Sequence, residues 1–72
     1  MAKVIEAREL GYIIHLNPPK VVVSLRFLLD GRLIAVRITT YPLSVPIYDL
    51  VDMLKDEYGA DEVHFQPLLN LE

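Results

Sequence analysis

The chain has 72 residues, of which 53% are hydrophobic, 24% are charged and none is cysteine, and its formal net charge is −3. A chain of this length supports one domain, and its core leaves only about 3 to 5 kcal/mol of net stability, so we expect self-association to contribute. The absence of cysteine excludes disulfides, thiolate metal ligands and cysteine nucleophiles.

The apolar runs are short and interrupted, and none approaches the roughly 20 residues that cross a bilayer. Four of the first nine residues are charged, where a secretory signal would need an apolar stretch. We therefore expect a protein of the cytoplasm, or of the interior of a virion, without membrane contact. The low content of Asn and Gln, with no Cys, is also consistent with a thermophilic source.

The first predicted element is a strand within residues 3–16. Apolar and polar residues alternate there in two phases, and the phase changes between Arg8 and Gly11. Such a change is typical of a β-bulge or of a kink between two short strands. Asn17-Pro18-Pro19 ends the strand, because proline has no N–H to donate to a sheet ladder.

Residues 20–41 predict a hairpin, because two β-branched apolar runs flank Asp30-Gly31, which favours a two-residue type I′ turn. If Leu29 and Arg32 flank the turn, the register follows and Phe27 faces Ile34. One face is then the core face, with Val21, Val23, Leu25, Phe27, Ile34, Val36 and Ile38. The other face carries Val22, Ser24, Arg26, Leu28, Leu33, Ala35, Arg37 and Thr39.

A single helix is predicted over residues 46–58. Ser44 is the expected N-cap, and Pro46 is tolerated in the first turn because N–H groups there have no intrahelical partner. Gly59 provides the C-terminal stop. One apolar stripe runs along the helix and comprises Ile47, Leu50, Val51, Leu54 and Tyr58.

The last element is a strand that contains Val63 and Phe65, and Pro67 limits it to the edge of a sheet or to a strand followed by an extended tail. The predicted order is βββαβ, in a single α+β domain over residues 1–72. We expect a mostly antiparallel sheet of three or four strands with one helix packed on one face. An alternative arranges the hairpin, the helix and the last strand as a β-grasp.

The residues that could carry chemistry form no pattern typical of an enzyme. The three glycines are isolated, so no phosphate-binding loop is present. Neither Ser24 nor Ser44 has the context of a nucleophile. A metal site would require His15 and His64 to meet a carboxylate across the sheet, and their spacing does not indicate this. We therefore predict a protein that is not an enzyme and that has no cofactor or metal.

Exposed apolar residues indicate an interaction surface instead. A contiguous apolar group on an open sheet face is one that a monomer would cover, and leucines are unusual on a solvated tail. We therefore predict an interaction module that forms a homodimer or larger homo-oligomer and binds a protein partner, through the outer sheet face or the C-terminal segment. The candidate interface residues are Val22, Leu28, Leu33, Tyr41, Leu68, Leu69 and Leu71.

The charge distribution keeps a nucleic-acid-binding or regulatory protein as the alternative. Residues 1–41 carry six basic and three acidic side chains, whereas residues 42–72 carry one basic and seven acidic. The predicted register places Arg26 and Arg37 close together on the outer face. Few aromatic residues accompany them, so we expect at most weak, salt-sensitive binding. The candidate anion-binding residues are Lys20, Arg26, Arg32 and Arg37.

Overall fold

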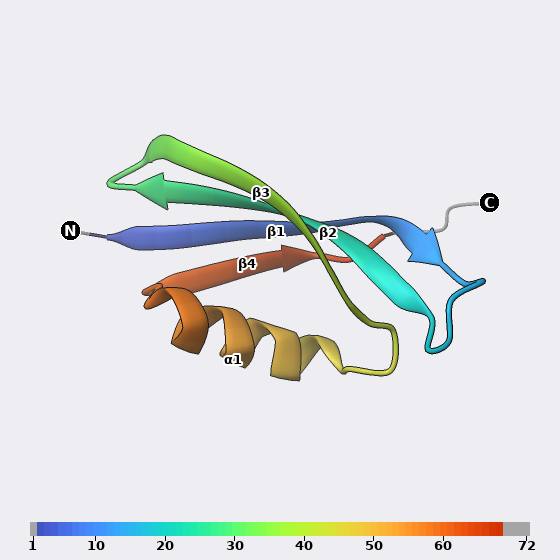
Figure 1. The fold of residues 1–72 in the computed structure, drawn as a ribbon. Coiled ribbons are helices and arrows are strands. Elements are labelled where there is room, and N and C mark those ends of the chain that lie inside the picture. Colours follow the sequence, from blue (N-terminus) through green and yellow to red (C-terminus); the bar gives the residue numbers. More distant parts are fainter. Residues whose placement is uncertain (1, 69–72) are drawn as a thin grey trace.

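The computed structural model describes residues 2–68, which form four strands and one helix in the order βββαβ (Figure 1). The elements are β1 (Lys3–Ile13), β2 (Lys20–Leu29), β3 (Arg32–Pro42), α1 (Ile47–Tyr58) and β4 (Glu62–Gln66). The sheet order is β3-β2-β1-β4, and only the pair of β1 and β4 is parallel. The predicted α+β class and element order are confirmed. The β-grasp alternative is wrong, because β4 pairs with β1 and not with the hairpin.

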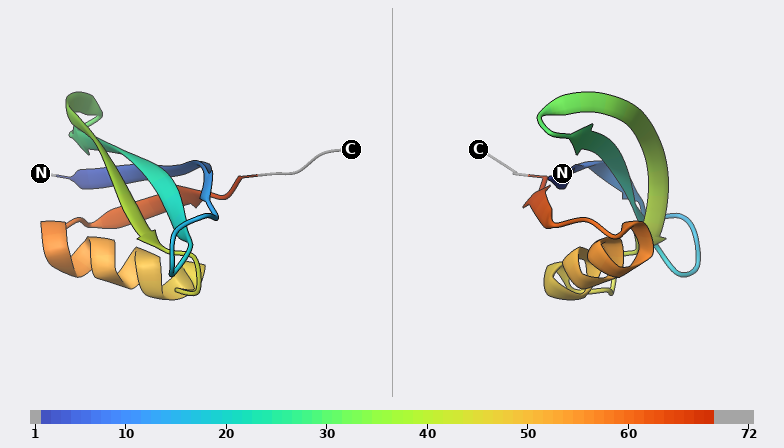
Figure 2. Two further views of the ribbon diagram at one scale, coloured as in Figure 1. Left: turned by 45° about the vertical axis from the view of Figure 1, so that its right-hand side comes forward. Right: turned by 90° about the vertical axis from the view of Figure 1, so that its left-hand side faces the viewer.

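The helix covers only part of one sheet face, as the two views in Figure 2 show. A helix is about 10 Å wide and neighbouring strands are about 4.8 Å apart, so one helix covers little more than two strands. In this fold α1 contacts β4 and packs beneath the centre of the sheet. The edge strand β3 curves away from the helix along most of its length.

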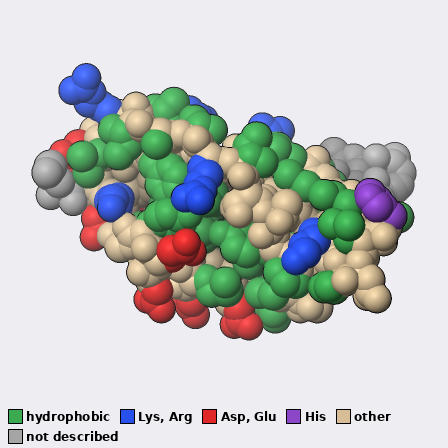
Figure 3. Space-filling model, in the orientation of Figure 1, with side chains coloured by type: hydrophobic (Ala, Val, Ile, Leu, Met, Phe, Trp, Pro, Cys, Tyr) green, Lys and Arg blue, Asp and Glu red, His purple; other side chains and the backbone are tan. Residues whose placement is uncertain are grey.

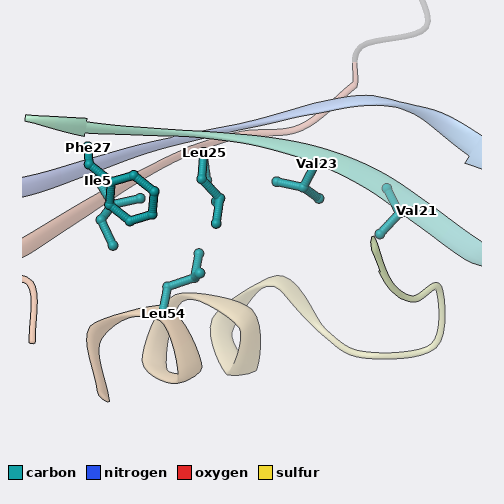
Figure 4. Packing of buried hydrophobic residues seen from close by; sticks show 7 residues of the cluster. Ile5, Val21, Val23, Leu25, Phe27 and Leu54 are labelled. Carbon is teal, nitrogen blue, oxygen red and sulfur yellow. The ribbon is translucent and has the colours of Figure 1, made fainter. Parts of the chain in front are cut away.

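The core lies between α1 and the inner face of the sheet. Figure 4 shows Val23, Leu25 and Phe27 of β2 pointing toward the helix, where Leu54 meets them. Phe27 also packs edge-on against Tyr58, with 4.9 Å between ring centroids. The buried residues are Ile5, Ala7, Val21, Val23, Leu25, Phe27, Leu50 and Leu54.

The central strand β1 is held on both sides. Its register with β2 shifts between Glu9 and Gly11, which confirms the predicted bulge. At its start, the backbone N–H of Ala2 donates to Asp30 and that of Lys3 donates to Asp61, both over 2.8 Å. The hairpin turn and the start of β4 are thereby joined to the same end of β1.

The two glycine-dependent features occur where the sequence predicts them. Asp30 and Gly31 both have positive φ, 51° and 82°, as a type I′ turn requires. The helix ends at Gly59, which is left-handed with φ 64°.

The predicted N-cap is wrong. Pro46 precedes the helix with extended backbone, and no side chain caps the first turn. Ser44 lies too far before Ile47 to act as the cap, because it belongs to a turn closed by the N–H of Val45 donating to the carbonyl of Pro42.

The predicted register of the β2–β3 hairpin is also wrong from Phe27 onward. Leu28 pairs with Leu33 as expected, but Phe27 pairs with Ala35, so Ile34 is an extra residue in β3. One inserted residue moves every later side chain of the strand to the opposite face. Val36 and Ile38 therefore lie on the outer face and not in the core, while Ala35, Arg37 and Thr39 lie on the helix side.

Substitution of Phe27 by alanine should remove a large part of the core. The loss of a buried phenylalanine costs about 3 to 5 kcal/mol, which is comparable to the whole net stability of a domain this small. We expect Phe27→Ala to show no cooperative urea unfolding transition, whereas Ile34→Ala, at an exposed position, should unfold like the wild type. An unchanged transition for Phe27→Ala would contradict the described core.

Substitution of Gly31 by valine should destabilise the hairpin through the backbone alone. A Cβ at this position would meet no atom within 4 Å, so the cost comes from the positive φ. We expect Gly31→Val to lower the free energy of unfolding by at least about 1 to 2 kcal/mol in urea titrations. Gly31→Asn is the control, because asparagine tolerates this region, and it should cost clearly less.

Candidate interaction surface

The N-terminal half of β3 is open to solvent on both faces. Every residue from Arg32 to Ile38 is exposed. Four of them are large and apolar, with exposed fractions of 50% for Leu33, 55% for Ile34, 57% for Val36 and 64% for Ile38. Figure 3 shows hydrophobic side chains over much of this side of the molecule, and acidic ones along the lower border, where Figure 1 places α1.

The exposed side chains of β3 continue onto β2. Leu33 pairs with Leu28. Ile38 pairs with Ser24, which lies between Val22 and Arg26 on the outer face of β2. Paired residues on neighbouring strands point to the same side of a sheet. We call the resulting outer-face group the β3 strip, which consists of Val22, Leu28, Leu33, Val36 and Ile38.

The structure describes five of the predicted interface residues and places them in three different locations. Val22, Leu28 and Leu33 lie on the outer face as expected. Tyr41 does not, because it pairs with buried Val21 on the helix side and packs against the core. The extra residue Ile34 shifts the register of β3, and this shift puts Tyr41 on the helix side just as it puts Val36 and Ile38 on the outer face.

Of the C-terminal candidates, the structure describes only Leu68. Leu68 is exposed, and its backbone N–H donates to Glu9 on β1 over 2.8 Å. Leu69 and Leu71 lie outside the described residues. The role of this segment in an interface stays a prediction.

The predicted cationic patch is not assembled. Arg26 lies on the outer face, where it forms an exposed ion pair with Glu6 at 3.4 Å. Arg37 lies on the helix side, where it donates to the Tyr58 hydroxyl over 3.5 Å. Lys20 and Arg32 lie at opposite ends of the hairpin, since they pair with Pro42 and Leu29. The prediction that Arg26 and Arg37 lie close together on one face is therefore wrong. The four basic residues do not form one binding surface.

A shallow hollow of about 380 Å³ lies on the outer face beside the β3 strip. Ser24 and His64 both line it, but β1 runs between their strands, which puts their backbones about 10 Å apart. The His64 Nε2 atom lies 2.9 Å from a Glu62 oxygen. A serine nucleophile needs its base within hydrogen-bond reach, so the hollow holds no serine–histidine pair of that kind.

Two other features are absent from the described residues 2–68. No group of three or more His, Asp or Glu side chains gathers there in a way that could hold a metal ion. Over the same residues, no helix has the length and apolar character needed to cross a membrane.

The sequence contained a signal for the missed residues Val36 and Ile38. Counting back from the turn pairs Leu29 with Arg32, whereas counting from the far end pairs Val21 with Tyr41. These two pairings differ by one residue in β3. A hairpin that contains both pairings therefore needs one extra residue, a bulge, in β3 between them.

Comparison with family models, with curated proteins and with solved structures finds no significant match to this chain. The β3 strip and the strand that carries it are the features of the molecule that bear on its function.

The half-buried Tyr41 should make stability fall at high pH. Burial raises the pKa of Tyr41 above its usual value of 10, and the nearby Tyr58 and Glu57 add to this effect. The unfolded chain then loses the proton at lower pH than the folded one, so the free energy of unfolding decreases as pH rises above about 10. Thermal melting of wild type and Tyr41→Phe from pH 8 to 11 tests this, and equal slopes would contradict it.

Proposed function

We propose that this protein is a non-enzymatic interaction module that self-associates and binds protein partners through the outer face of its sheet at the β3 strip. The observation that carries the proposal is that every residue of the segment 32–38 is exposed, four of them large and apolar. Apolar groups that lie together on a surface are typical of interfaces between proteins.

The two edges of the sheet support this proposal by their contrast. The edge strand β4 has only five residues, is followed by Pro67 and carries Glu62 and His64 on its outer side. Short length, charge and proline are the features by which proteins prevent association at an edge. The opposite edge strand β3 has 11 residues, and its outer side carries Val36 and Ile38.

Mixed charges on the remaining outer face favour a protein partner over a nucleic acid. Arg26 forms an ion pair with Glu6, and the His64 ring lies 2.9 Å from a Glu62 oxygen. A phosphate backbone would need unpaired cations along a track, and it would have to approach a chain with net charge −3. An apolar strip bordered by polar and charged side chains matches the core and rim of a protein interface.

Light scattering over a range of protein concentrations tests the proposal. We expect the mass to rise from the monomer value of 8.2 kDa toward twice that value at micromolar concentrations. Val36→Lys combined with Ile38→Lys should keep the monomer mass at all these concentrations, because it places two charges in the β3 strip.

Tyr48→Lys is the matched control, because Tyr48 is a large exposed side chain on α1, away from the strip. It should associate like the wild type. A wild-type mass that stays at 8.2 kDa over the whole range would refute self-association. Equal association of the double variant would refute the assignment to the β3 strip.

A further inference from the structure

The open edge of β3 has a defined set of backbone groups that point away from the sheet. In an antiparallel ladder, successive residues direct their N–H and C=O groups alternately to the two sides of the strand. The N–H of Leu43 donates to the Pro19 carbonyl over 2.9 Å, which fixes the alternation at one end of the hairpin. At the turn, the N–H of Asp30 donates to the Ala2 carbonyl over 2.8 Å, so Asp30 directs its N–H toward the β1 side of β2. Alternation along β2 then directs the N–H groups of Val21, Val23, Leu25 and Phe27 toward β3, in agreement with the bond of Leu43.

Residues Ala35–Pro42 pair with β2 without interruption, so the direction of the backbone N–H and C=O groups alternates regularly along this part of β3. Ala35, Arg37, Thr39 and Tyr41 direct their backbone groups to β2. Val36, Ile38 and Thr40 therefore direct theirs to the open edge, on which no other described strand or helix lies.

The run of free edge-facing residues, Val36, Ile38 and Thr40, is bounded in both directions along β3. Pro42 is the next edge-facing residue, but it has no N–H, and its carbonyl accepts from the N–H of Val45. In the other direction, the extra residue Ile34 interrupts the regular alternation. The three free residues thus form a short, uninterrupted edge that is symmetric about Ile38.

We infer that this edge pairs antiparallel with the same edge of a second copy, around a two-fold axis at Ile38, so that one sheet continues through both copies. In this register Ile38 faces Ile38 of the other copy, and each Val36 faces a Thr40. The inference rests on the proposed function and specifies its partner and binding mode. A two-fold interface requires a self-complementary surface, which this free set provides.

The charge on β3 disfavours the neighbouring register whose two-fold axis lies at Arg37. An axis at Arg37 would place two arginines directly opposite each other, which is destabilising. With the axis at Ile38, each Arg37 instead faces Thr39 of the other copy, a neutral residue with a hydroxyl acceptor. Arg37 also stays beside Tyr58 of its own chain on the helix side.

The interface expected from this pairing is small. Three residue pairs that each exchange two hydrogen bonds give about six bonds, and interfaces carry about one per 100 to 200 Å². This corresponds to roughly 600 to 1,200 Å² of buried surface, the range of weak and reversible complexes. We therefore expect a dimer that dissociates on dilution through the micromolar range.

Single cysteine variants test the register directly, because the chain contains no cysteine. Directly opposed residues of this kind have Cα atoms about 5.5 Å apart, within the range of a disulfide. Under mild oxidation, Ile38→Cys should form a covalent dimer on non-reducing gels.

Val36→Cys is the matched control, because it lies on the same face of the same strand and is also exposed. Its two copies would be four residues out of register, about 13 Å apart, so we expect little covalent dimer from this variant alone. An equimolar mixture of Val36→Cys and Thr40→Cys should form the mixed disulfide, because those two positions face each other.

The outcome separates the inference from the proposed function. If wild type associates in light scattering but Ile38→Cys cross-links no faster than Val36→Cys, edge pairing at Ile38 is wrong, while self-association stands. A further variant, Ile38→Pro, removes an edge-facing N–H, a change that a sheet edge tolerates, and Ile38→Thr is its control because it also loses the isoleucine side chain but keeps the N–H. Folded Ile38→Pro, judged by circular dichroism, should lose association at least tenfold, whereas Ile38→Thr should retain more, and equal association of both would also refute edge pairing.

Discussion

One extra residue in β3, opposite Phe27, decides which side chains of this strand can reach the core. Without it, Val36 and Ile38 would face the helix with Val23 and Leu25. With it, they face outward, and the helix side receives a small residue, a cation and a threonine at positions 35, 37 and 39. Because side chains alternate along a strand, this single insertion separates the apolar surface of β3 from the core of its own chain.

The fold can leave the apolar surface of β3 uncovered because the single helix is too narrow to cover all four strands. One helix of about 10 Å covers the centre of the sheet, where Ile5, Leu25 and Leu54 meet. The strand β3 lies beyond it and is held mainly by its ladder with β2, together with the contact between Arg37 and Tyr58. A second copy along the open edge would supply the backbone partners that this strand lacks on one side, which is why we assign the edge and the exposed strip to one interface.

The sequence predicted the elements well and the faces of one strand badly. The type I′ turn, the bulge in β1 and the helix with its Gly59 stop all depend on local signals within a few residues, and all are confirmed. The face of β3 depends instead on its pairing with β2 along the whole hairpin. Both phases of β3 contain residues that a core accepts, so alternation alone could not reveal the insertion. The same error produced the predicted patch of Arg26 and Arg37, and it hid Val36 and Ile38.

Amide hydrogen exchange of β3, followed residue by residue at several protein concentrations, tests the central claim most directly. Arg37 and Thr39 donate to β2 and should be protected at every concentration. The amides of Val36, Ile38 and Thr40 should be protected only at concentrations where the protein is dimeric, and they should exchange freely on dilution. Fast exchange of these three amides in a sample shown by light scattering to be dimeric would contradict pairing at the β3 edge.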